Sequence, residues 1–301
     1  MRATLLHFKT LVEFLILVSI VNKMLISYPA PYWMEHGSYL EYGGRISHIF
    51  FYHLLFNKTT IHKQLFSIAG VEVLRSDSNI DGLSFKEEID VHVSLLIEDL
   101  NGSTGLFKVT LTVGPYNSTK NLLIDLLTKQ VTLPDGTPLG QTTIWIQPCK
   151  VGDRIPFVGQ GNTTVFAKAS DVSFRDTVQS VQDCIVLDVS EHQWKGYVGV
   201  YFNLSPPETQ TIKFFNPRIN YYDADTFIMI EGDIDEDALL SAFGIAGFFG
   251  RSFKLTSTNI DLGPPNLLMT LLRLLPYLVP LTIFLIAIIY FILIKKRGIG
   301  T

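Results

Sequence analysis

The chain has 301 residues, of which 47% are hydrophobic and 17% charged, and its formal net charge is −4. Lysine and arginine are scattered, and no basic patch is interleaved with aromatic residues, which argues against a nucleic-acid partner. Once the two hydrophobic ends are set aside, about 235 residues remain, enough for one large or two small domains.

The N-terminal 30 residues have the composition of a secretory signal. Arg2 and Lys9 precede a short apolar stretch at residues 11–21, and a polar step follows it. The stretch is short for a membrane-spanning helix, but no good small-x-small cleavage site follows. Residues 1–30 are therefore predicted to be a signal peptide or an uncleaved N-terminal signal anchor.

Residues 31–148 are predicted to form a first β-rich exterior unit. Residues 89–97 and 106–113 alternate between apolar and polar side chains, and Asn101-Gly102-Ser103 supplies a turn between them. Asp135-Gly136 predicts a second hairpin, between residues 130–133 and 142–146. Residues 121–129 fit a strand or a short helix. Two further strands are predicted at residues 38–42 and 45–55.

Residues 149–262 are predicted to form a second β-rich exterior unit, which alternatively makes one domain with the first. Its predicted strands are residues 164–169, 183–189, 196–202, 219–222, 227–232 and 253–260. The predicted fold class is mainly β, an antiparallel sheet built as a sandwich or curved half-barrel, with one C-terminal transmembrane helix.

Five segments of this β region carry short motifs. They are residues 31–42 (PYWMEHGSYLEY), 135–146 (DGTPLGQTTIWI), 150–155 (KVGDRI), 220–226 (NYYDADT) and 255–260 (LTSTNI). Together they resemble the motifs of membrane-anchored surface proteins of thermophilic archaea. Phe227 departs from that pattern, because glycine usually stands there. The resemblance implies an uncharacterised exterior β-domain and supplies no catalytic residue.

N-glycosylation sequons indicate which side of the membrane this region occupies. Five N-x-[ST] matches lie between the hydrophobic ends, and chance predicts about two. The predicted acceptors are Asn57, Asn101, Asn117, Asn162 and Asn203, of which at least two are expected to carry glycan. Glycosylation at these positions would indicate that the region is extracellular.

The only two cysteines, Cys149 and Cys184, both lie in this exterior region. A pair without a leftover thiol suits one disulfide in an oxidising compartment. The alternative is two buried reduced thiols.

The segment 238–250 is unusually apolar and lies shortly before the C-terminal helix. Internal packing against the sheet is one explanation, and contact with the membrane or a partner is another. The candidate contact residues are Leu239, Phe243, Ile245, Phe248 and Phe249.

The C-terminal end predicts a membrane anchor. Residues 274–294 are uncharged and apolar, and Lys295, Lys296 and Arg297 follow at once. The predicted transmembrane helix covers residues 267–294, and residues 295–301 form a cytoplasmic tail. Pro276 and Pro280 are expected to mark the outer start of the helix, with a kink as the alternative.

No catalytic motif, metal site or cofactor site is predicted. Asp233, Asp235 and Asp237 resemble the start of a calcium loop, but Ala238 and Gly244 stand where that loop needs glycine and glutamate. The sequence thus predicts a single-pass cell-surface membrane protein, not an enzyme, that acts in binding or scaffolding at the cell envelope, with an envelope protein or a glycan as partner. The alternatives are an exterior carrier of a hydrophobic ligand or lipid and an exterior hydrolase.

Overall fold

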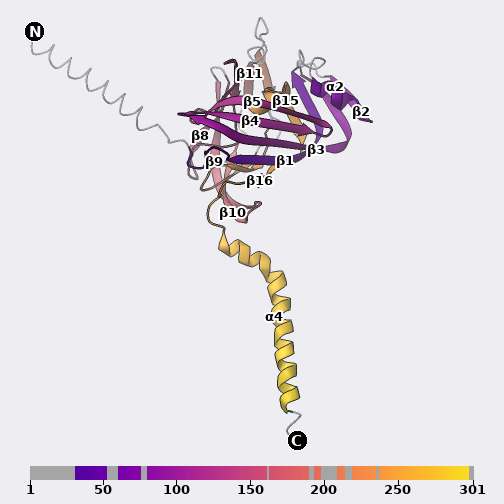
Figure 1. Ribbon diagram of the computed structural model, residues 1–301, viewed down its shortest axis with the longest axis vertical. Coiled ribbons are helices and arrows are strands. Elements are labelled where there is room, and N and C mark those ends of the chain that lie inside the picture. Colours follow the sequence, from indigo (N-terminus) through magenta and orange to yellow (C-terminus); the bar gives the residue numbers. More distant parts are fainter. Residues whose placement is uncertain are drawn as a thin grey trace, which may run out of the picture.

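The computed structural model describes residues 31–52, 60–75, 80–160, 163–189, 193–197, 209–213, 219–234 and 237–297. The protein is mainly antiparallel β, as the sequence predicts. A curved β body is followed by one long helix that projects away from it (Figure 1). The predicted N-terminal signal, residues 1–30, lies outside the described residues.

Most strands belong to one open sheet of 14 strands, in the order β7-β6-β5-β4-β3-β1-β16-β14-β13-β10-β9-β8, with β15 on β1 and β2 on β3. β11 and β12 form a separate pair. The strand bounds are β1 Tyr39–Tyr52, β2 Val71–Arg75, β3 Ile80–Asn101, β4 Thr104–Val113, β5 Tyr116–Asp125, β6 Gln130–Thr132, β7 Pro138–Gln141, β8 Arg154–Gln160, β9 Thr163–Asp176, β10 Val181–Asp188, β11 Gln193–Tyr197, β12 Thr209–Lys213, β13 Ile219–Asp223, β14 Met229–Gly232, β15 Ile245–Gly250 and β16 Phe253–Thr258.

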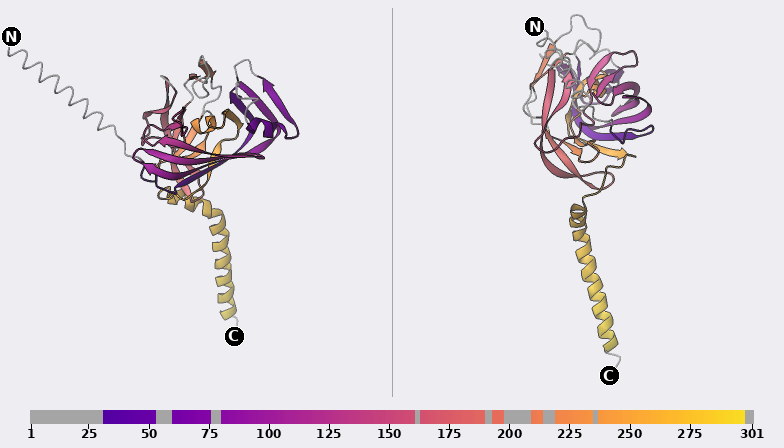
Figure 2. Two further views of the ribbon diagram at one scale, coloured as in Figure 1. Left: turned by 45° about the horizontal axis from the view of Figure 1, so that its top comes forward. Right: turned by 90° about the vertical axis from the view of Figure 1, so that its left-hand side faces the viewer.

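The described helices are α2 Thr60–Phe66, α3 Ala238–Ser241 and α4 Leu267–Arg297. The sheet curls so that its β3–β5 part and its β8–β10 part face each other across the core (Figure 2). Trp145 lies in this core, where it stacks on Phe107 of β4 and meets the edge of Trp33. Strands of both predicted units, 31–148 and 149–262, share this sheet, since β1 pairs with β16.

The first predicted hairpin is present, and the second has a different second arm from the one predicted. β3 and β4 meet at a turn in which Asn101 lies opposite Thr104, and β4 alternates buried and more exposed side chains. β6 and β7 form the second hairpin around Asp135-Gly136. Its second arm, β7, ends at Gln141, before the predicted strand 142–146 begins, and Thr142 and Thr143 bond with Asp237 instead.

The alternative of a short helix at residues 121–129 is wrong. β5 runs through Asp125 with Leu122 and Ile124 buried, which is the two-residue period of a strand. The chain then turns, because the Asp125 carboxylate accepts hydrogen bonds from the backbone N–H groups of Leu127 and Thr128.

The apolar segment 238–250 packs inside the protein over most of its length. Leu239, Phe243, Ile245 and Phe248 are buried in the core, so they offer no surface to a membrane or partner, and that prediction is wrong for these four residues. β15 pairs with residues 46–51 of β1, and this pairing holds the segment against the sheet. Phe249 alone among the five candidates is exposed, at 57%.

The predicted disulfide is also wrong, because Cys149 and Cys184 are both free and buried. Cys184 on β10 is followed by Ile185, which lies opposite Tyr222. Cys149 is close enough to Tyr222 to add to the rise that burial causes in the pKa of that phenol. The fold therefore keeps two buried thiols and does not join them in a disulfide.

α4 begins at Leu267, so Pro276 and Pro280 lie inside the helix and do not mark its start. Within the described residues, no single helix is long and apolar enough to cross a membrane. Two segments of α4, Leu267–Leu278 and Thr282–Ile289, meet that requirement only as a pair, and they are bent by 46°. The bend contains Pro280, which lacks a backbone N–H, and the Thr282 hydroxyl donates to the Leu278 carbonyl beside it.

Candidate functional site

An open cleft of about 700 Å³ lies where β1, β3, β14 and β16 run side by side in the sheet. Charged and polar side chains line much of it, together with two glycines. The lining includes Gly43, Arg45, His92, Glu231, Arg251 and Lys254.

Strand register builds the floor of the cleft. Tyr221, Glu231, Lys254, Gly43 and His92 lie opposite one another in a single row across β13, β14, β16, β1 and β3. Residues paired in this way project from the same face of a sheet. A Cβ at Gly43 would lie only 3.0 Å from the Thr256 methyl group and 3.4 Å from His92 Nδ1, so these two side chains approach the glycine closely.

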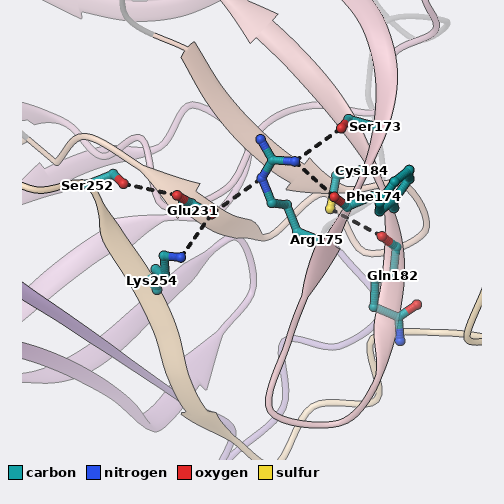
Figure 3. Close-up of polar contacts among 8 residues, drawn as sticks. All are labelled: Ser173, Phe174, Arg175, Gln182, Cys184, Glu231, Ser252 and Lys254. Carbon is teal, nitrogen blue, oxygen red and sulfur yellow. Dashed lines mark hydrogen bonds and ion pairs between the residues drawn. The ribbon is translucent and has the colours of Figure 1, made fainter. Parts of the chain in front are cut away.

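Glu231 is the hub of the polar contacts on this face (Figure 3). Its Oε2 lies 3.3 Å from Arg175 Nε and 3.5 Å from Lys254 Nζ. Ser252 Oγ donates a hydrogen bond of 3.1 Å to its Oε1. One carboxylate therefore fixes groups from β9, β16 and the segment before β16.

Arg175 is held from several directions. Its Nη1 donates to Ser173 Oγ at 3.1 Å and to the Phe174 carbonyl at 2.9 Å. Its guanidinium carbon lies 3.4 Å from the ring centre of Tyr221, which is a cation–π contact. An arginine stacked and bonded in this way is pre-organised, since its planar group loses little further freedom on binding.

Two more ion pairs stand at the other side of the cleft. Arg45 Nε lies 3.2 Å from Asp90 Oδ1, and Arg251 Nε lies 3.2 Å from Glu88 Oε2. Acidic and basic groups thus alternate across the surface. Such a surface offers guanidinium and ammonium donors beside carboxylate acceptors, which is the pattern that a ligand rich in hydroxyl groups can bond.

Ser47 and His48 are neighbours on β1, and their side chains are hydrogen-bonded to each other. Ser47 Oγ lies 2.8 Å from His48 Nδ1 and 3.1 Å from the Phe249 carbonyl oxygen. The hydroxyl has one proton, and a carbonyl can only accept. Either the Phe249 carbonyl or His48 Nδ1 can therefore receive the serine proton, and the tautomer of His48 decides between them.

A second polar cluster is buried inside the protein. The Asp237 carboxylate accepts from the Thr143 N–H at 2.6 Å, from the Thr142 and Thr143 hydroxyls, and from the Leu239 N–H. It caps the N-terminus of α3 and fastens it to the segment after β7. Burial raises the pKa of Asp237 even though these hydrogen bonds lower it. The cluster is fully enclosed, so it serves the fold.

Lys129 lies near Asp237 and is also buried. Its Nζ donates to the Phe157 carbonyl at 2.7 Å, which links the turn after β5 to β8. Burial lowers the pKa of Lys129 to about 8, and the charge of Asp237 opposes that change. The cost of burying an ammonium is the cause, since desolvation disfavours the charged form.

The predicted glycan acceptors are described at two positions. Asn101 and Asn117 are both exposed, at the β3–β4 turn and on β5. Asn117 continues the row of the cleft, because it lies opposite Thr112, which lies opposite His92. Asn57, Asn162 and Asn203 lie outside the described residues.

Sequence reasoning missed the cleft, whose lining residues come from separate strands. No group of three potential metal ligands occurs among the residues that the structure describes. Comparison of the sequence with protein-family models and with curated proteins finds no match to either.

Proposed function

We propose that this protein is a membrane-anchored exterior binding module whose cleft binds a hydrophilic glycan of the cell envelope. The observation that carries the proposal is the cleft itself, where charged donors and acceptors alternate around Glu231 on a hydrogen-bonded sheet. Polar groups on a rigid scaffold lose little freedom when a ligand binds, which favours affinity.

The anchor in this proposal is α4. Its apolar side chains are widely exposed, among them Leu267, Leu271 and Ile283, and the helix projects from the β body (Figure 1). Exposed apolar surface of this extent indicates contact with lipid or protein. By the positive-inside rule, the basic residues 295–297 at its end support a cytoplasmic C-terminus and an exterior β domain.

A carrier of a lipid or other hydrophobic ligand is less well supported. Such a protein needs a largely apolar cavity of several hundred Å³ that encloses its cargo. The cleft around Glu231 is large enough, at about 700 Å³, but it is open and is lined by Arg45, Arg251 and Lys254. The enclosed space beside Trp145 has only about 20 Å³, room for a water molecule.

The test is a glycan array probed with the full chain in mild detergent, followed by titration calorimetry of the best glycan. The double variant Arg45→Ala/Lys254→Ala trims two cleft side chains, and Lys108→Ala is the control, since Lys108 is exposed on β4 outside the cleft. We expect the double variant to bind about tenfold more weakly and the control to bind normally. Equal glycan binding by all three proteins would overturn the assignment of the cleft.

A further inference from the structure

The turn between β9 and β10 lies at the end of the β body from which α4 departs (Figures 1 and 2). Gln179 in this turn donates to the Ile260 carbonyl at 2.6 Å and accepts from the Leu262 N–H at 3.2 Å. Gln182 Nε2 donates to the Gly263 carbonyl at 3.3 Å. The segment that leads into α4 is therefore fastened to the β9–β10 turn.

Asn266, the residue before α4, completes this attachment. Its N–H donates to the Val181 carbonyl at 2.9 Å, and its Nδ2 donates to Asp183 Oδ1 at 2.7 Å. Its Oδ1 accepts from the Met269 N–H and so caps the helix. The first turn of α4 consequently has a fixed position relative to β10.

Apolar side chains are exposed beside that attachment. Phe174 is 47% exposed and lies opposite Asp183, the partner of Asn266, and Val178 at the turn is 48% exposed. Side chains paired across antiparallel strands are about 5 Å apart, so Phe174 lies close to the start of α4. Leu267, Leu268 and Leu271 then continue the exposed apolar surface onto the helix.

We propose that the β9–β10 tip, defined here as Phe174 and Val178, inserts into the lipid surface together with the first turns of α4. This inference rests on the proposed anchoring by α4. Its partner is lipid because the tip is continuous with the exposed apolar face of α4. Two side chains are also far less than the roughly 800 Å² per partner that a stable protein interface buries.

The contact would fix how the β domain stands on the membrane. The segment 238–250, for which membrane contact was one of two explanations from the sequence, is mostly buried, whereas the tip is exposed where the chain leaves the sheet. Asp176 and Asp261 are exposed beside the tip and would be repelled by anionic lipid. The suitable probe is therefore a zwitterionic phosphatidylcholine vesicle.

The experiment places an environment-sensitive fluorophore on the full chain in such vesicles, at Val178→Cys, and measures quenching by phosphatidylcholine spin-labelled on its acyl chains. Val151→Cys is the matched control, because Val151 is 50% exposed in a turn that bonds to Ala169, in the middle of β9 and away from the β9–β10 tip. Leu285→Cys reports on the anchor. Cys149 and Cys184 are buried, with pKa values raised to about 11 and about 12, so they stay unlabelled near neutral pH.

We expect the Val178 probe to be quenched about threefold more strongly than the Val151 probe, since interfacial insertion reaches only ~10 Å into the bilayer. Quenching at Leu285 with none at Val178 would overturn the contact and leave the anchor intact. A Val178 signal that is blue-shifted but not quenched would indicate burial against a second copy and would also refute it. Absence of quenching at Leu285 would overturn both proposals.

Discussion

Replacing Lys129 with methionine should change how the free energy of unfolding depends on pH. The Lys129 ammonium is buried and its pKa is lowered from 10.5 to about 8. At 1.36 kcal/mol per pKa unit, this difference corresponds to about 3 kcal/mol. Between these two pH values the unfolded chain keeps the lysine proton and the folded chain has released it. The unfolded state then binds more protons, so stability rises with pH across this window.

The methionine variant has no such proton to release and should lack that rise. Near pH 7 the substitution removes the unfavourable desolvation of the ammonium, and it also removes the hydrogen bond to the Phe157 carbonyl. These two effects oppose each other, so the stability of the variant should resemble that of the parent protein. Near pH 10.5 it should be less stable by about 3 kcal/mol.

The assay is urea unfolding of the full chain in mild detergent at several pH values from 7 to 10.5. Cys149 and Cys184, whose pKa values are raised, lower the stability above pH 9 in both proteins, and this effect cancels when the two are compared. Lys108→Met is the control, since Lys108 is exposed. Parallel pH curves for the parent protein and Lys129→Met would refute the conclusion that a buried ammonium is destabilising at neutral pH.

Three further predictions follow from single contacts. The thiols of Cys149 and Cys184 should resist alkylation at pH 8 in the folded chain and both react without reductant in urea, whereas a disulfide would leave no thiol under either condition. Tyr42→Phe should lower the free energy of unfolding by about 1–2 kcal/mol, because the buried Met229 carbonyl loses its partner, and Tyr39→Phe, at a partly exposed hydroxyl, should cost less. Glu231→Gln should cost about 1 kcal/mol, because the carboxylate joins Arg175 and Lys254 at a partly exposed site; a variant as stable as the parent would show that this hub is not needed for folding.

The sequence predicted most of the strands because their signal is local. In β4, every second side chain is buried, and this two-residue period can be recognised in the sequence of residues 106–113 alone. The helix alternative at residues 121–129 arose because Leu122, Leu123 and Ile124 are consecutive apolar residues, which fit either period. Tertiary pairing with β4 decided in favour of the strand.

The disulfide prediction failed because composition says nothing about where a side chain lies in the fold. Two cysteines suit a bridge by count alone, and only the folded chain shows that both are buried as free thiols. The same holds for the segment 238–250. Its apolar composition is equally compatible with a core or a surface, and its pairing with β1 resolves the question.

The cleft could not be read from the sequence, because its parts are brought together only by long-range pairing. Gly43 meets Lys254 where β1 pairs with β16, and Glu231 reaches the same row from β14. In the chain, each of these residues is an ordinary strand residue with polar or charged neighbours. The row forms only when five strands pair in register, so that Gly43 lies between Lys254 and His92. No local sequence pattern predicts that register.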